Sequence, residues 1–223
     1  MGVQCVDCVK EASASLRPTR SRLGFKTAAG PPRVTIALIA INVAVYLYGM
    51  TLADGQLFSQ LALWPHYDVL DPYYWAGTEW WRWISSGFVH LGVVHIGMNM
   101  LVLYMFGREL EPLLGRARFA LVYGLSLLGA SALVSLLSPQ NHPTGGASGA
   151  VYGLIAAYVA IAVSLRLPVR SLVLQAGAWL IAGFIIPGLS WQGHLGGALV
   201  GWLVTTLILR LARGDEARRA HRA

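Results

Sequence analysis

Six long apolar segments dominate the sequence from residue 34 onward and limit the folds open to it. They cover about 34–50, 89–111, 117–138, 147–165, 169–187 and 191–210, and each has the roughly 17–25 residues that cross a bilayer as a helix. Only 12% of the 223 residues are charged, against ~25% in soluble globular domains. A soluble enzyme is therefore excluded, and we expect an all-α integral membrane protein with six transmembrane helices in a bundle.

The positions of Lys and Arg support a layout with six spans. Sixteen of the 17 basic residues fall on one side of that layout, and only Arg82 falls on the other. Because Lys and Arg accumulate in cytoplasmic segments, we expect both termini in the cytoplasm and the chain in the cell (inner or plasma) membrane. The net charge of +7 is then explained by membrane orientation, and no nucleic-acid partner is expected.

The chain divides into three expected parts. Residues 1–33 form a basic, disordered cytoplasmic tail, residues 34–211 form the six-helix domain, and residues 212–223 form a second basic tail. The first part shows no apolar stretch followed by a cleavage site, so we expect no cleaved signal peptide. Cys5-x-x-Cys8 supplies only half of a four-ligand zinc site, and we predict no bound metal.

The loop between the first two apolar segments, residues 51–88, is rich in aromatic residues. It contains five of the eight Trp residues, together with three Tyr residues: Trp64, Trp75, Trp80, Trp81, Trp83, Tyr67, Tyr73 and Tyr74. Aromatic side chains with polar tips favour the boundary between membrane and water. We therefore expect this loop to lie in the outer interface, and the alternative is an ordinary solvated loop.

Ser148 opens the fourth apolar segment, directly after the polar stretch 139–146. Free backbone N–H groups and the positive end of the helix dipole are concentrated at a helix N-terminus, where they stabilise a developing oxyanion. The alternative is structural, because Gly145, Gly149 and Gly153 form a row of small residues that suits helix packing. Taken alone, Ser148 favours the structural interpretation.

His194 lies near the outer end of the sixth segment, among glycines that recur every four residues at 193, 197 and 201. One face of that helix therefore lacks side chains, as does the face of the fourth helix that carries Gly149 and Gly153. Two such faces let helix backbones approach closely, which a short serine and an imidazole need for a hydrogen bond. The alternative for His194 is a buried histidine bonded to a backbone carbonyl.

The two groups are also expected at similar depth. Ser148 precedes Arg166 by 18 residues, or ~27 Å of helix, and His194 precedes Arg210 by 16 residues, or ~24 Å. No Asp or Glu occurs between Pro112 and Gly214, so helices three to six offer no acidic third member to His194. This absence also excludes an intramembrane aspartyl protease, and without an H-E-x-x-H motif a zincin-like site is excluded.

Four motifs together resemble the rhomboid family of intramembrane serine proteases, over about residues 34–211. They are Gly146-Ala147-Ser148-Gly149, His194 with Gly193, Gly197 and Gly201, the H-x4-H-x3-N pattern of His90, His95 and Asn99 on the second helix, and Trp81-Arg82 in the first loop. Gln4–Cys8 also resembles the last knuckle of a zinc module that begins some bacterial rhomboids, so we expect a truncated or late-start form.

The resemblance implies a Ser–His dyad in which Ser148 is the nucleophile and His194 the general base and acid. It further implies an oxyanion site made by the Ser148 backbone N–H and the side chains of His95 and Asn99. Further residues support the site: Tyr152 against the histidine ring, Glu111 as a structural partner of the first loop, His90, Gly146, Gly149, Gly197, Gly201, Trp81 and Arg82. The implied substrates are single-pass membrane proteins cut near the outer face, no cofactor is implied, and the oligomeric state is left open.

Two other functions remain possible for this sequence. One is a catalytically inactive rhomboid-like binding protein, although such relatives usually lack the serine or histidine. The other is a transporter or channel in which His95, Asn99 and His194 line a polar path. No membrane-embedded carboxylate and no obvious inverted repeat support that second alternative. For the protease, we expect activity to fall on acidification, because His194 must be neutral to accept a proton.

Overall fold

The computed structural model describes residues 5, 7–8, 21, 23, 25, 30–53, 55–65, 79–138, 143–185 and 188–220. For 183–185 and 213–220 it describes only the backbone. Parts of the first-loop and nucleophile-loop predictions lie outside these residues, including Tyr67, Tyr73, Tyr74, Trp75 and residues 139–142. The disorder expected for residues 1–33 remains a prediction for most of that range.

The described residues form helices and no strand. The helices are α2 (Arg33–Gly49), α3 (Gln56–Leu61), α4 (Arg82–Ser85), the 3₁₀ turn η1 (Ser86–Phe88), α5 (Val93–Leu114), α6 (Arg116–Leu137), α7 (Ser148–Ser164), α8 (Arg170–Ile185) and α9 (Trp191–Ala220). A single antiparallel bridge joins Leu63 to Thr144. The prediction of an all-helical chain is therefore confirmed for the described residues.

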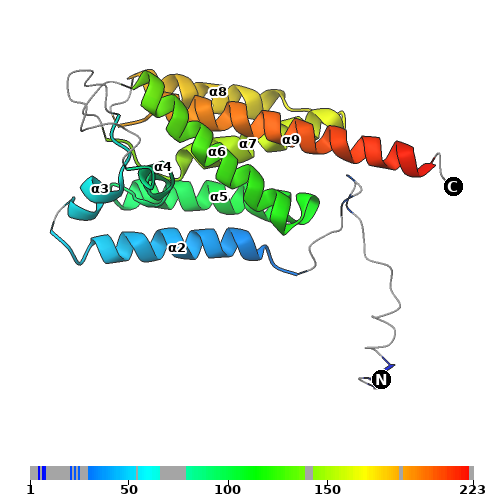
Figure 1. Cartoon of the computed structure of the whole chain (residues 1–223), viewed down its shortest axis with the longest axis horizontal. Coiled ribbons are helices and arrows are strands. Elements are labelled where there is room, and N and C mark those ends of the chain that lie inside the picture. The colour runs from blue at the N-terminus through cyan, green and yellow to red at the C-terminus, as the bar shows by residue number, and fades with distance from the viewer. Residues whose placement is uncertain are drawn as a thin grey trace.

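The long helices lie side by side in a bundle, with α2 next to α5 and α8 at the opposite side (Figure 1). Helices α6, α7 and α9 share the most extensive contacts, while α8 packs sparsely against α9 and α7. Five of the long helices begin and end within a few residues of the predicted segments. The exception is α9, which continues to Ala220, almost three turns beyond the predicted end at 210.

In the part of the chain that the structure describes, two helices are long and apolar enough to cross a bilayer by themselves, namely α6 and the stretch Trp191–Ala212 of α9. A third candidate is the pair Arg82–Phe88 and Val93–Leu114, which passes the same test but is bent by 96°. Helices α2 and α7 are apolar, with 17 residues each. Several membrane spans are thus supported, and the predicted number of six stays a prediction.

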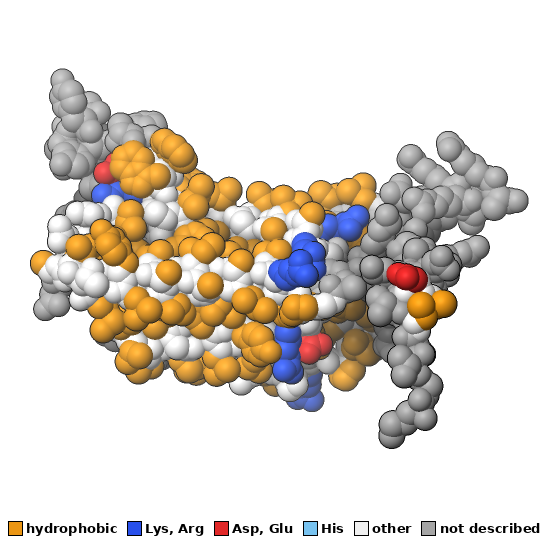
Figure 2. Space-filling view, turned by 90° about the horizontal axis from the view of Figure 1, so that it is seen from below, with side chains coloured by type: hydrophobic (Ala, Val, Ile, Leu, Met, Phe, Trp, Pro, Cys, Tyr) orange, Lys and Arg blue, Asp and Glu red, His pale blue; other side chains and the backbone are white. Residues whose placement is uncertain are grey.

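Charge and apolar surface are separated along the bundle. Hydrophobic side chains cover the length of the face seen in Figure 2, while most of the visible Lys and Arg side chains gather towards one end. That end includes the turn between α5 and α6, where Arg108, Arg116 and Arg118 lie close in sequence. Gly115 makes this turn at φ +82°, a backbone conformation that suits glycine.

The start of α2 is capped by a residue from another helix. Pro32 precedes α2 and provides no side-chain cap, so the first backbone N–H groups need partners. The Glu111 carboxylate, fully buried on α5, accepts hydrogen bonds from the N–H groups of Val34 and Thr35 and from the Thr35 hydroxyl. The sequence predicted that Glu111 would hold the first loop, whereas its hydrogen bonds tie α5 to α2.

Phe25, from the N-terminal part of the chain, packs into the bundle. Phe25 is 7% exposed and belongs to the hydrophobic core cluster. The guanidinium of Arg118, near the start of α6, lies 4.2 Å from the centre of the Phe25 ring. A short turn supports this position, because the Ser21 N–H donates to the Phe25 carbonyl over 2.8 Å. Phe25 therefore packs against the end of the bundle that carries Arg118.

Candidate active site

The chain before Ser148 is held by hydrogen bonds from distant segments. Thr144 exchanges two backbone hydrogen bonds with Leu63, at 2.8 and 2.9 Å. The Gly146 N–H donates to the Ser86 carbonyl over 2.8 Å, and the Ala147 N–H donates to Nε2 of His90 over 3.2 Å. Gly146 itself has φ +124°, which glycine adopts without strain. This loop places Ser148 as the first residue of α7.

His90 was predicted on the second helix, and this placement is wrong. It lies in the coil between η1 and α5, because the chain turns sharply before α5 begins at Val93. Gly92, at φ +81°, precedes that helix. His90 is 7% exposed and holds the nucleophile loop through the Ala147 N–H, so its described contacts are structural.

Helices α7 and α9 meet through their glycines. A methyl group built on Gly197 would collide with the carbonyl of Gly149, and one built on Gly201 would collide with that of Gly153. In the other direction, a methyl group on Gly149 would lie 3.2 Å from the Gly193 carbonyl. Close backbone contact of this kind requires small residues on both helices. Ser148 and His194, each next to one of these glycines, therefore lie at the same end of this contact.

The imidazole of His194 is positioned by packing. The side chain is 5% exposed, and its ring stacks on that of Tyr152 with centroids 4.2 Å apart and an angle of 10° between planes. Tyr152 is one turn after Ser148 on α7, so the same helix supplies both the serine and the ring beneath the histidine. Among the described residues, no hydrogen bond joins Ser148 to His194, and Nδ1 of His194 has no partner. Catalytic hydrogen bonds are often open in the absence of substrate.

The two predicted oxyanion donors on α5, His95 and Asn99, differ in what their side chains contact. The His95 ring packs on the loop, because a methyl group on Gly146 would lie 2.8 Å from its Cε1 and Nε2 atoms. The Asn99 amide donates one N–H to the His95 carbonyl over 3.0 Å, and the residue is 6% exposed. The second N–H of the amide is left for another acceptor. His95 is thus close to the nucleophile loop, while Asn99 is partly engaged by its own helix.

The predicted Trp81-Arg82 motif anchors the first loop. The Arg82 guanidinium donates to the carbonyls of Ser59 and Ala62 and also binds Glu79. Ser85 adds a hydrogen bond to the Leu61 carbonyl. Since Leu63 pairs with Thr144, these bonds connect the first loop to the chain before Ser148. Trp81 itself is 41% exposed, and the interfacial position expected for it stays a prediction.

Helix α6 contributes to the site although its residues were not singled out in the sequence. A methyl group on Gly153 would collide with the Ser126 side chain, and one on Gly149 would collide with Ala130. A methyl group built on Gly129 would lie 3.0 Å from the carbonyl oxygen of Gly196 on α9. The signal that could have revealed this role is the row of small residues at Ser126 and Ala130, spaced by four like the glycines of α7.

The two cysteines lie apart from this site. Both Cys5 and Cys8 are free and exposed, and hydrogen bonding to the backbone of Cys8 lowers the pKa of the Cys5 thiol. Within the described part of the chain, no cluster of three or more His, Cys, Asp or Glu side chains could hold a metal ion.

Comparison with known proteins identifies the family. The family model described as the Rhomboid domain matches residues 77–211, which is more than half of the chain. The rhomboid protease GlpG of Yersinia enterocolitica is 31% identical over 189 residues, covering 81% of this chain and 63% of that protein. The rhomboid protease GluP of Bacillus subtilis is 30% identical over 141 residues, covering 60% of this chain and 27% of that protein.

This chain thus spans less than two thirds of the length of these curated relatives. The match nevertheless includes α4 to α8 and most of α9, and with them His90, His95, Asn99, Ser148, Tyr152 and His194. The resemblance seen in the sequence motifs is therefore confirmed, and the chain is a multi-pass membrane protein that belongs to the rhomboid family.

Proposed function

We propose that this protein is an intramembrane serine endopeptidase that cuts membrane-protein substrates in or near their transmembrane segments. The relatives named rhomboid proteases support proteolysis as the activity. The observation that carries the proposal is the contact between α7 and α9 at Gly149 and Gly193. It brings the helix that starts with Ser148 against the helix that carries a buried His194. Ser148 and His194 would then act as a dyad.

The proposed reaction has two steps. In the first, the Ser148 oxygen attacks the scissile carbonyl carbon while His194 takes the hydroxyl proton. The tetrahedral intermediate collapses, the C–N bond breaks, and His194 returns the proton to the leaving amine. In the second, water attacks the acyl carbon while His194 takes one of its protons. The bond from that carbon to the Ser148 oxygen then breaks, and His194 returns the proton to Ser148 as the new carboxyl end is released. No cofactor takes part in either step.

The oxyanion is proposed to lie at the N-terminus of α7. There the Ser148 N–H and the helix dipole favour negative charge. His95 supports the same position from α5, because its ring packs on Gly146 two residues before the nucleophile. The free N–H of Asn99 is the third proposed donor. The ring of Tyr152 would keep the His194 imidazole in the orientation needed to reach the serine.

The proposed topology has six spans, formed by α2, α5, α6, α7, α8 and α9, with both termini in the cytoplasm of a cell-membrane protein. The segregation of basic residues supports it, since Arg82 alone falls on the outer side. The dyad would then lie beneath the outer surface. Substrates would be single-pass helices with small residues at the cut and a locally weak helix.

Cleavage of a tagged single-pass protein by the purified enzyme in liposomes tests the proposal. We expect cleavage by the wild type and loss of at least ~10³-fold in rate for both Ser148→Ala and His194→Ala. A fluorophosphonate probe should label the wild type and neither variant. A wild type that cuts none of several substrates and takes no probe would instead favour an inactive, binding member of the family.

The pH dependence tests the role of His194 separately. A protonated imidazole cannot accept the Ser148 proton, so the initial cleavage rate should fall as the pH is lowered from 8 to 3. The rate is measured in liposomes whose interior and exterior share one buffer, with circular dichroism confirming that the fold persists. A flat profile over this range contradicts a general-base role for His194.

A further inference from the structure

Arginine side chains come together at the corner between α2, α5 and α6, at the end of the bundle where most of the basic side chains visible in Figure 2 gather. Arg33 is the first residue of α2, and Arg116 is the first residue of α6. Glu111 connects these positions, because its Oε1 atom accepts the Val34 N–H over 3.1 Å and lies 3.9 Å from Nε of Arg116. The two arginines therefore flank one buried carboxylate.

Arg108 brings a third guanidinium to the same corner. Gly107, directly before it, packs on α2 so tightly that a methyl group built there would collide with the Thr35 side chain. The guanidinium of Arg108 lies 5.9 Å from the centre of the Tyr104 ring, one turn earlier on α5. Arg108 and its ion-pair partner Glu109 both have side chains that are 56% exposed. An exposed pair of this kind is weak, so Arg108 is able to bind another anion.

Positive charge prevails at the surface of this corner. Glu111 is fully buried, and its oxygens already accept three hydrogen bonds from α2. Arg33 is exposed and the Arg116 side chain is 40% exposed, while Glu109 is the carboxylate beside them at the surface. With Arg108, three guanidinium groups thus meet one carboxylate there. A guanidinium donates two parallel hydrogen bonds to a phosphate, so this corner attracts an anion with several oxygens.

The surface next to these arginines is apolar, which points to a lipid as the source of the anion. Ile36, about one turn after Arg33 on α2, is 46% exposed. Tyr104 and Met105, about one turn before Arg108 on α5, are 45% and 51% exposed. Exposed apolar side chains beside a polar rim are typical of surfaces that contact membranes. A phosphate joined to acyl chains matches both parts of this surface, whereas a soluble anion matches only the arginines.

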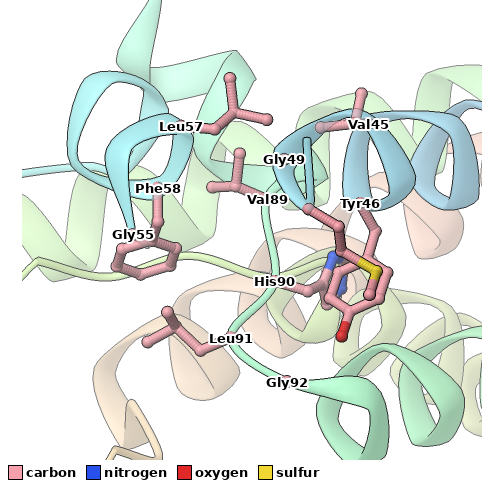
Figure 3. A pocket seen from close by; sticks show the side chains of 11 residues that line it. Val45, Tyr46, Gly49, Gly55, Leu57, Phe58, Val89, His90, Leu91 and Gly92 are labelled. Carbon is pink, nitrogen blue, oxygen red and sulfur yellow. The ribbon is translucent and has the colours of Figure 1, made fainter. Parts of the chain in front are cut away.

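The opposite end of α2 offers a contrast. A pocket of about 210 Å³ lies there, with Val45, Leu57, Phe58 and Leu91 among its walls (Figure 3). Among the described residues that line it, none is Asp, Glu, Lys or Arg. This pocket therefore has no charged group that would distinguish one lipid headgroup from another, and selection of a headgroup is expected at the corner between α2, α5 and α6.

We propose that this corner binds the headgroup phosphate of an anionic glycerophospholipid, with Arg33, Arg108 and Arg116 as its donors. The acyl chains lie along the exposed apolar side chains of α2 and α5. A zwitterionic lipid is less favoured, because the arginines repel its cationic headgroup. The bound phosphate joins α2 to α5 and α6 at the surface, as Glu111 does in the interior. The site requires the membrane location of the family and not proteolysis, so it stands or falls separately from the proposed activity.

Native mass spectrometry of the full chain tests the site. The protein is placed in detergent micelles with equal amounts of phosphatidylglycerol and phosphatidylcholine, and the lipids that stay bound are identified by mass. We expect phosphatidylglycerol to exceed phosphatidylcholine by about tenfold. Arg33→Gln combined with Arg116→Gln should abolish this preference, since each arginine contributes about fivefold to the binding of an anionic headgroup. The matched control combines Arg170→Gln with Arg210→Gln, which removes the same charge from exposed positions on α8 and α9 and should keep the preference.

Arg33→Gln combined with Arg108→Gln is a second test, because it leaves the ion pair between Arg116 and Glu111 intact. We expect it to lower the preference as well, and melting temperatures in phosphatidylcholine micelles show whether each variant is folded. An equal loss in the control variant would mean that the whole basic end attracts anions and would overturn the site. A wild type without preference for phosphatidylglycerol would do the same. Release of the bound lipid by inorganic phosphate would assign the corner to a soluble anion and equally overturn the proposal.

Discussion

The two sides of this bundle are held together by different chemistry. Helices α7 and α9 touch through backbone atoms at glycines, with Ser126 and Ala130 of α6 closing the contact. Helix α2 and the first loop are instead held by side chains that bind backbone groups, through Glu111 and Arg82. In a bilayer the hydrophobic effect does not drive helices together, so either close packing or hydrogen bonding must do so. The candidate dyad lies in the half that uses close packing.

The largest loss of stability is expected from a large side chain at the glycine contact between α7 and α9. Gly197→Leu should prevent folding, with a loss of more than ~4 kcal/mol, because the Gly149 carbonyl opposite is backbone and cannot move aside. Gly124→Leu is the control, since a methyl group there meets nothing within 4 Å. Thermal unfolding in detergent micelles measures both. Equal melting temperatures would show that α7 and α9 are not held at this distance.

In the half held by hydrogen bonds, we expect a substitution to lower the free energy of unfolding by a smaller amount. Glu111→Ala should lower the free energy of unfolding by ~3 kcal/mol, because it leaves the N–H groups of Val34 and Thr35 buried without a partner. Glu109→Ala, two residues earlier on α5, removes an exposed carboxylate and should change stability by less than ~0.5 kcal/mol. Similar values for the two variants would mean that water replaces the cap.

For the contact between Phe25 and the bundle, we expect a still smaller loss in the free energy of unfolding. Phe25→Ala should cost ~2 kcal/mol, the usual gain from burying a phenylalanine side chain. Phe25→Leu keeps most of the apolar burial and loses only the contact with the Arg118 guanidinium, for which ~0.5–1 kcal/mol is expected. Denaturation in a mixed-micelle titration distinguishes the two. A Phe25→Ala variant as stable as the wild type would show that this segment does not pack on the bundle in solution.

The smallest effect is expected at the other end of α7 and has the opposite sign. Arg166 has φ 57°, and it follows the last turn of α7, where the Leu167 N–H donates to the Ala162 carbonyl over 2.8 Å. A left-handed residue after a helix is usually glycine. Arg166→Gly should therefore raise stability by ~0.5–1 kcal/mol. Destabilisation would show that the arginine side chain contributes more than its backbone conformation costs.

The sequence predicted the structure correctly where a residue acts through the absence of a side chain, as glycine does. The four-residue spacing of glycines predicted close backbone approach between the helices of Ser148 and His194, since a missing side chain has the same consequence in any surroundings. It was less successful where a residue acts through a distant partner. The hydrogen bonds of Glu111 reach residues 76 and 77 positions away, and nothing in the local pattern identifies them.

The placement of His90 failed for a different reason. The H-x4-H-x3-N pattern of His90, His95 and Asn99 predicts a single helix, although Gly92 lies within it. The structure uses that glycine for a left-handed turn, so the two histidines come from different elements while their rings remain 5.0 Å apart. The pattern therefore predicted the secondary structure at His90 incorrectly, because tertiary contacts decided the conformation of residues 89–92.

The loop before Ser148 has a consequence for the entropy of the proposed reaction. Ordering one residue costs ~1–2 kcal/mol of backbone entropy, and a loop that became ordered only on substrate binding would add that cost to the barrier. Here the amides of Thr144, Gly146 and Ala147 are already bound before any substrate arrives. Their hydrogens should exchange with solvent as slowly as those of a helix interior, and the activation entropy of cleavage should contain no contribution from ordering this segment.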